Sequence, residues 1–126
     1  MTAVTKRILL AEDDRFIRRA CEASLRQRGF EILTAADGEE ALRLAQAERP
    51  DLILLDLLMP KVSGVEVLRT LKGTDETKAI PVVIVTNSSG ELTREDALKM
   101  GATAYLVKAH LTLQELGDRV AALLTG

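Results

Sequence analysis

Five short apolar runs, separated by segments with helical spacing, constrain the fold of this chain more than any other feature. The runs cover residues 8–11, 30–34, 52–55, 82–85 and 104–107. Their length and their β-branched residues favour strands over helices. Four of the runs are apolar at successive positions, which is typical of parallel strands that are buried on both faces. The run that begins at Phe30 is less uniform, so we expect it at an edge of the sheet.

The segments between the runs predict helices. The first and last of them have apolar stripes at helical spacing, formed by Ile17, Cys21 and Leu25 and by Leu113, Leu116, Val120 and Leu123. Residues 93–100 form the most polar helical segment, and Thr112 with Glu115 has the spacing of a capping box. Strands that alternate with helices predict a doubly wound α/β fold, a parallel sheet with right-handed crossovers and helices on both faces.

Length and composition exclude several classes of protein. The 126 residues fit one domain, which we expect to span residues 1–126 with residues 1–5 as a flexible start. A net charge of −2 argues against a nucleic-acid-binding domain and a polybasic membrane binder. No apolar run approaches the roughly 20 residues that span a bilayer. The single cysteine, Cys21, allows no intrachain disulfide, so we expect a cytoplasmic protein.

Acidic residues follow two of the predicted strands. Glu12, Asp13 and Asp14 come after the first strand, and Asp56 comes after the third. Acids at a helix N-terminus are also favoured by the helix dipole, so the first group has a purely structural reading as well. However, the carboxyl ends of parallel strands form the ligand-binding crevice of such folds. Carboxylates about 4 Å apart there repel by roughly 4 kcal/mol, and oxygen ligands of this kind suit Mg²⁺.

A hydroxyl and an ammonium group complete the set of polar side chains at the strand ends. Thr86 follows the fourth run and Lys108 follows the fifth. Each residue alone is ordinary, since loop hydroxyls and solvated lysines are common. A metal, an ammonium and a hydroxyl donor around one carboxylate are nevertheless what a phosphoryl group requires. An aspartate can act as the nucleophile and form an aspartyl-phosphate.

Four motifs resemble the receiver domain of bacterial two-component response regulators. They are the acidic Glu12-Asp13-Asp14 after Ile-Leu-Leu-Ala, then Asp56-Leu-Leu-Met-Pro60 with Gly64, then Thr86, and then Tyr105-Leu-Val-Lys108. Residues 13, 56, 86 and 108 are 43, 30 and 22 positions apart, as in that family. The resemblance covers nearly the whole chain, in extent like the stand-alone chemotaxis regulator, and implies a flavodoxin-like sheet with strand order 2-1-3-4-5.

The resemblance also implies the chemistry of the acidic residues. Asp56 would accept the phosphoryl group from a phosphohistidine of a histidine kinase or histidine phosphotransferase. Asp13 and Asp56 would bind Mg²⁺ directly, together with the main-chain carbonyl of Leu58, and Glu12 would bind it through water. The chain would then be a signalling domain whose only reactions are its own Mg²⁺-dependent phosphoryl transfer and a slow self-dephosphorylation. Leu58 and Ser88 would keep that hydrolysis slow, since neither orients water well.

The remaining motif residues would transmit the signal. Lys108 would contact the phosphoryl oxygens and Thr86 would hydrogen-bond to one of them, while Tyr105 would turn inward as Thr86 moves. A downstream protein would bind the surface formed by helix 4, strand 5 and helix 5, with no direct contact to nucleic acid or membrane. Two departures from the family are Ala109, where a proline is usual, and the absence of an acidic pair before Tyr105.

Other functions remain open at this point. A receiver-like module that docks without phosphorylation is the main alternative, although Asp56 and Lys108 are both present. A haloacid-dehalogenase-type phosphatase would need a second acid where this chain has Leu58. The sequence identifies neither the kinase nor the target. It is also compatible with a single-domain regulator and with one receiver from a longer protein.

Overall fold

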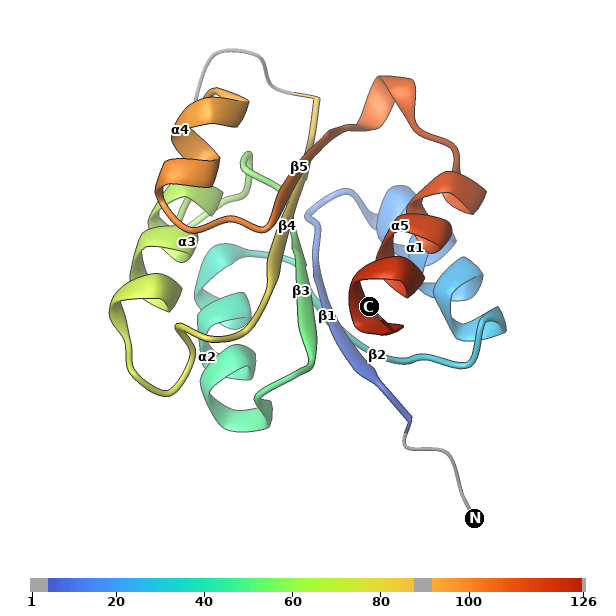
Figure 1. Cartoon of the computed structure of the whole chain (residues 1–126), viewed down its shortest axis with the longest axis horizontal. Coiled ribbons are helices and arrows are strands. Elements are labelled where there is room, and N and C mark those ends of the chain that lie inside the picture. Colours follow the sequence, from blue (N-terminus) through green and yellow to red (C-terminus); the bar gives the residue numbers. More distant parts are fainter. Residues whose placement is uncertain (1–4, 88–91, 126) are drawn as a thin grey trace.

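A five-stranded parallel sheet lies at the centre of the computed structural model, which describes residues 5–87 and 92–125. Its order is β2-β1-β3-β4-β5, as predicted, and β2 lies at an edge (Figure 1). The strands are β1 (Arg7–Ala11), β2 (Glu31–Ala35), β3 (Leu52–Leu55), β4 (Val82–Thr86) and β5 (Ala104–Val107). Most of the flexible start predicted at residues 1–5 lies outside the described residues.

Helices cover both faces of the sheet. The helices α1 (Arg15–Gln27) and α5 (Leu113–Thr125) lie together on one face (Figure 1). The other face is covered by α2 (Gly38–Glu48), α3 (Gly64–Gly73) and α4 (Arg94–Lys99) (Figure 1). A single 3₁₀ turn, η1 (Lys108–His110), connects β5 to the segment before α5. The peptide bond between Lys108 and Ala109 is trans, since no described peptide bond is cis.

The sheet separates two hydrophobic layers, and β3 contributes to both. All four of its residues are buried. Leu52 and Leu54 pack on the side of α1 and α5, and Ile53 and Leu55 pack on the opposite side. Successive side chains of a strand point to opposite faces, which explains why a strand buried on both sides is apolar at every position.

The capping box before α5 is confirmed, but the apolar stripe of this helix is buried only in part. The Thr112 N–H donates to Glu115 Oε1 and the Glu115 N–H donates to Thr112 Oγ1, both at 3.0 Å. Leu113 and Leu123, at the two ends of the stripe, are 42% and 39% exposed. The 13 residues of α5 span about 20 Å, whereas the four residues of β5 span about 13 Å. The ends of the helix therefore extend beyond the sheet.

Candidate functional site

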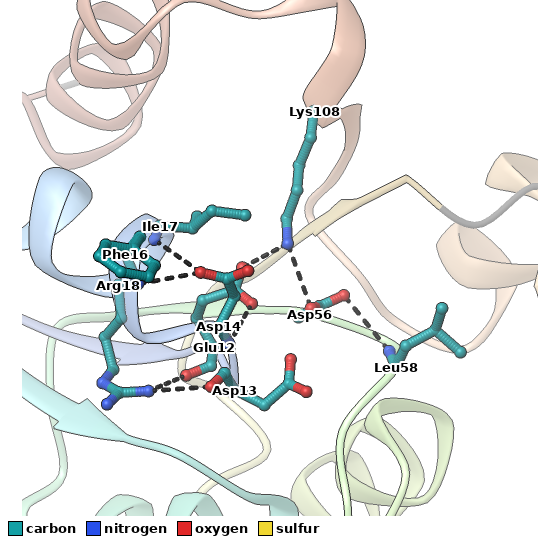
Figure 2. Close-up of polar contacts among 9 residues, drawn as sticks. All are labelled: Glu12, Asp13, Asp14, Phe16, Ile17, Arg18, Asp56, Leu58 and Lys108. Carbon is teal, nitrogen blue, oxygen red and sulfur yellow. Dashed lines mark hydrogen bonds and ion pairs between the residues drawn. The ribbon is translucent and has the colours of Figure 1, made fainter.

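The parallel pairing of β1 and β3 brings the predicted acids together. Ala11 is aligned with Leu55, so the residues that follow them, Glu12 and Asp56, leave the same edge of the sheet side by side. Asp13 follows Glu12 in the same loop. One carboxylate oxygen from each of these three acids lies within 4.8 Å of the others (Figure 2). The predicted cluster of three carboxylates is therefore present in the structure.

Lys108 compensates the charge of the two acids that are buried. Glu12 is 3% exposed and Asp56 is 6% exposed, whereas Asp13 is exposed. The Lys108 ammonium donates to Glu12 Oε1 and, at 3.1 Å, to Asp56 Oδ2 (Figure 2). Burial lowers the pKa of Lys108, but the contacts with Glu12 and Asp56 more than offset this effect, so that the pKa is raised. The lysine therefore stays positively charged and compensates the charge of the two buried carboxylates.

The two buried carboxylates also accept bonds from main-chain N–H groups. Asp14 N–H donates to Glu12 Oε2 at 3.1 Å, and Leu58 N–H donates to Asp56 Oδ1 at 3.3 Å. Burial raises the pKa of Glu12 to about 6, although the hydrogen bonds from Lys108 and from the Asp14 N–H act in the opposite direction. Because burial still disfavours the charged form of Glu12, a further cation close to it would be favourable.

Two residues of the loop after β1 have structural roles. Asp14 caps α1, since its Oδ1 accepts from the N–H groups of Phe16 and Ile17 at 2.9 and 3.0 Å (Figure 2). The structural reading of the acids after the first strand is therefore correct for Asp14. Arg18 turns back from α1 and donates to the carbonyl oxygens of Glu12 and Asp13 at 2.8 and 3.2 Å (Figure 2). Arg18 could not be recognised from the sequence, because no sequence pattern fixes the partner of an arginine one turn into a helix.

Thr86 and Tyr105 lie on adjacent strands. Thr86 is the last residue of β4, one position inside the strand rather than after it, and it is fully buried. Tyr105 in β5 is 6% exposed, and its hydroxyl donates to the Leu92 carbonyl at 2.9 Å. The Arg94 guanidinium lies 5.5 Å from the centre of the Tyr105 ring. The tyrosine that was predicted to turn inward is thus already inward in this structure.

The segment after Asp56 packs tightly against α3. Gly64 begins that helix, and a Cβ added to it would lie 2.2 Å from the Asp56 carbonyl oxygen and 2.4 Å from Leu57 Cα. The Gly64 N–H donates to the Leu57 carbonyl at 2.9 Å. Leu58 is 50% exposed and lines a hollow together with Asp13. Ser88, the other residue predicted to influence hydrolysis, lies outside the described residues.

Comparison with known proteins identifies the family. Residues 8–121 match the family model of the response regulator receiver domain. The chain belongs to this family. The receiver is 44% identical over 124 residues to the transcriptional regulatory protein PrrA of Mycobacterium tuberculosis. This match covers 98% of the chain and 52% of PrrA. It is 35% identical over 121 residues to the alkaline phosphatase synthesis transcriptional regulatory protein PhoP of Bacillus subtilis. This match covers 96% of the chain and 49% of PhoP. It thus spans about half the length of these curated relatives.

Solved structures agree with this assignment. The chemotaxis response regulator CheY4 of Vibrio cholerae matches with a TM-score of 0.86 and 30% identity, over 96% of the receiver and 100% of CheY4. The receiver domain of the sensor histidine kinase PA1611 from Pseudomonas aeruginosa matches with a TM-score of 0.86 and 28% identity, over 98% and 100% of the two chains. That structure holds a magnesium ion in its active site cleft. No helix in the described part of the receiver is long and apolar enough to cross a membrane.

Proposed function

We propose that Asp56 accepts a phosphoryl group from a phosphohistidine of a histidine kinase or histidine phosphotransferase. The observation that carries this proposal is the contact between Lys108 Nζ and Asp56 Oδ2 at 3.1 Å in a buried acidic site. In the transfer, an Asp56 oxygen forms a bond to phosphorus while the bond from phosphorus to the donor nitrogen breaks. The imidazole nitrogen keeps the electron pair and takes up a proton.

The acidic cluster would hold the Mg²⁺ that this chemistry uses. Oxygen atoms of Glu12, Asp13 and Asp56 that lie within 4.8 Å of one another suit a hard cation. Asp13, Asp56 and the Leu58 carbonyl would bind it directly and Glu12 through water. The bound ion would neutralise charge on the phosphoryl oxygens. The cleft of the PA1611 receiver, which holds magnesium, supports this assignment.

Lys108 and Thr86 would stabilise the transferred group. The Lys108 ammonium already contacts Asp56, so it could contact a phosphoryl oxygen with a small movement of its side chain. Thr86 ends β4 at the same edge of the sheet, where its hydroxyl would donate to another oxygen. Positioning and charge neutralisation of this kind account for most of the catalysis of phosphoryl transfer.

Replacement of the acceptor tests the proposal. The receiver is incubated with acetyl phosphate and Mg²⁺, and the mass gain of one phosphoryl group is followed. We expect Asp56→Asn to abolish the gain. The matched control Asp75→Asn, at an exposed acid that pairs with Lys78, should take up phosphate like the parent. A normal gain in Asp56→Asn would refute the assignment.

The lifetime of the phosphorylated state is a second part of the proposal. Leu58 is half exposed beside the site, and its side chain cannot hydrogen-bond to an attacking water. We infer slow self-dephosphorylation. Replacing Leu58 by Asn and Ser88 by Glu in one variant should accelerate the loss of phosphate after removal of the donor. A variant that loses phosphate no faster than the parent would contradict this inference.

The output is proposed to be a protein that binds the surface formed by α4, β5 and α5. Leu98 of α4 is 45% exposed, and Tyr105 lies on β5, the strand that pairs with the strand that ends in Thr86. Direct binding of nucleic acid or membrane by this domain is not part of the proposal, and a cytoplasmic location stays a prediction. Beryllofluoride with Mg²⁺ should shift the ring resonances of Tyr105, and unchanged resonances would contradict this route.

A further inference from the structure

A cavity of about 430 Å³ lies between α1 and α5 next to the acidic site. The proposed phosphoryl transfer uses only the polar end of this cavity, formed by Glu12, Asp56 and Lys108. Its walls are mostly apolar and include Leu10, Ile17, Cys21, Leu54, Leu111 and Leu116. Small-molecule sites in proteins typically enclose roughly 300–1,000 Å³ and combine apolar walls with a few polar groups. The cavity has both the size and the lining of such a site.

Arg28, at the C-terminal end of α1, connects this helix to α5. Arg28 donates to the Gln114 carbonyl at 2.9 Å and to Asp118 Oδ1 at 2.8 Å. A Cβ on Gly117 of α5 would lie 2.1 Å from Arg28 Nε, so the guanidinium occupies the space that a side chain would fill. The arginine is thus fixed between the helices at this end. Nearer the start of α1, Cys21 lines the cavity.

The polar end of the cavity has an excess of negative charge. Glu12, Asp56 and Lys108 line it there, so two carboxylates are compensated by one ammonium. Carboxylate oxygens only accept hydrogen bonds, and this end therefore favours a positively charged donor. In the metal-free site, an anionic group would be repelled by the uncompensated carboxylate.

We propose that the cavity binds a small aromatic amine. The ring lies among Ile17, Cys21 and Leu116, and the ammonium group contacts the carboxylates of Glu12 and Asp56. The amine competes with Lys108 and with Mg²⁺ for these oxygens, and so it slows phosphoryl transfer to Asp56. This last consequence rests on the proposed function, whereas binding itself does not.

Two probes with the same ring and opposite charge test the site. Naphthylmethylamine and naphthoate are titrated into the metal-free receiver, and binding is followed by probe fluorescence and by the rate at which iodoacetamide alkylates Cys21. We expect the amine to bind at least about tenfold more tightly than naphthoate. Alkylation of Cys21 should slow in proportion to occupancy. Equal affinities, or an alkylation rate that the amine leaves unchanged, would overturn the proposal.

A matched pair of variants locates the bound ring. Cys21→Met extends a side chain into the cavity and should weaken the affinity for naphthylmethylamine, measured by probe fluorescence, by about tenfold or more. Ala23→Met places the same side chain at an exposed position of α1 and should leave binding unchanged. Unchanged binding in Cys21→Met would refute the site. If that variant does not fold, protection of Cys21 in the parent decides the question.

The consequence for phosphorylation is tested separately with acetyl phosphate. The amine should slow phosphate uptake by the parent at concentrations that fill the cavity. Uptake that is normal at full occupancy would refute the coupling. A receiver that binds the amine but takes up no phosphate on Asp56, with or without the amine, would refute the proposed function and leave the binding site intact.

Discussion

Gly64→Ala should destabilise the receiver through a direct collision with the backbone of Asp56 and Leu57. A Cβ at position 64 would lie 2.2 Å from the Asp56 carbonyl oxygen and 2.4 Å from Leu57 Cα. Both contacts are with backbone atoms, which cannot turn away as the end of a flexible side chain can. Ordinary van der Waals contact begins at 3.4 Å, so the start of α3 would have to move by about 1.2 Å.

The expected cost follows from two opposing effects. Overpacking at a well-packed site costs about 1–3 kcal/mol, and a collision with backbone on both sides belongs at the upper end of this range. Alanine gains up to about 1 kcal/mol over glycine inside a helix, and less at its first residue. The net loss in the free energy of unfolding is therefore about 2 kcal/mol. For a domain of this size, that corresponds to a decrease in Tm of roughly 8 °C.

A second glycine of the same helix is the matched control. Gly73 ends α3, and a Cβ there would meet nothing within 4 Å. Gly73→Ala should therefore be neutral or slightly stabilising. Urea unfolding followed by circular dichroism measures both variants against the parent. A Gly64→Ala receiver that unfolds within about 0.5 kcal/mol of Gly73→Ala would show that α3 yields without cost, and the steric argument would be wrong.

Three further predictions concern single side chains. Burial raises the pKa of Glu12 from 4.5 to about 6, so the native state binds this proton more tightly than the unfolded state does. In metal-free buffer, the free energy of unfolding should fall as pH rises from 4.5 to about 6 and beyond, by on the order of 1 kcal/mol. Glu12→Gln should remove this pH dependence, as measured by urea unfolding at several pH values. Burial raises the pKa of the Cys21 thiol, so alkylation at about pH 8 should be at least tenfold slower in the native than in the urea-unfolded chain, and equal rates would contradict this. Thr112→Ala removes the Oγ1 that accepts from the Glu115 N–H, so it should lower the free energy of unfolding in urea by about 1 kcal/mol; a loss below about 0.3 kcal/mol would argue against the cap.

The sheet could be predicted because parallel strands have to be apolar on both faces. All five runs form strands, and the less uniform run at Phe30 corresponds to the edge strand β2, which begins one residue later. The exposure of Leu113 and Leu123 could not be predicted, because it depends on the length of the helix relative to the strands beneath it. That relation is set by tertiary packing and not by helical periodicity.

The part of the site that could be predicted is the part whose residues are positioned by the ends of the strands. Glu12, Asp56 and Lys108 meet because each directly follows a strand of the same parallel sheet. Arg18 and Arg28 were missed, although both hold the structure around the site and the cavity. A long side chain reaches its partner through several rotatable bonds, so the identity of this partner depends on the tertiary structure and cannot be read from the local sequence.

The contact between Glu12 and Lys108 joins residues 96 positions apart, which directly follow the first and the last of the described strands. During synthesis, the acids of β1 and β3 emerge from the ribosome long before the lysine that compensates them. Until β5 has docked, Glu12 and Asp56 repel each other with no ammonium beside them. The site is therefore completed only with the last strand, and, if Asp56 accepts a phosphoryl group as proposed, a nascent or truncated chain that lacks β5 and Lys108 should not take it up. Phosphate uptake by chains that end before Lys108 would disprove this.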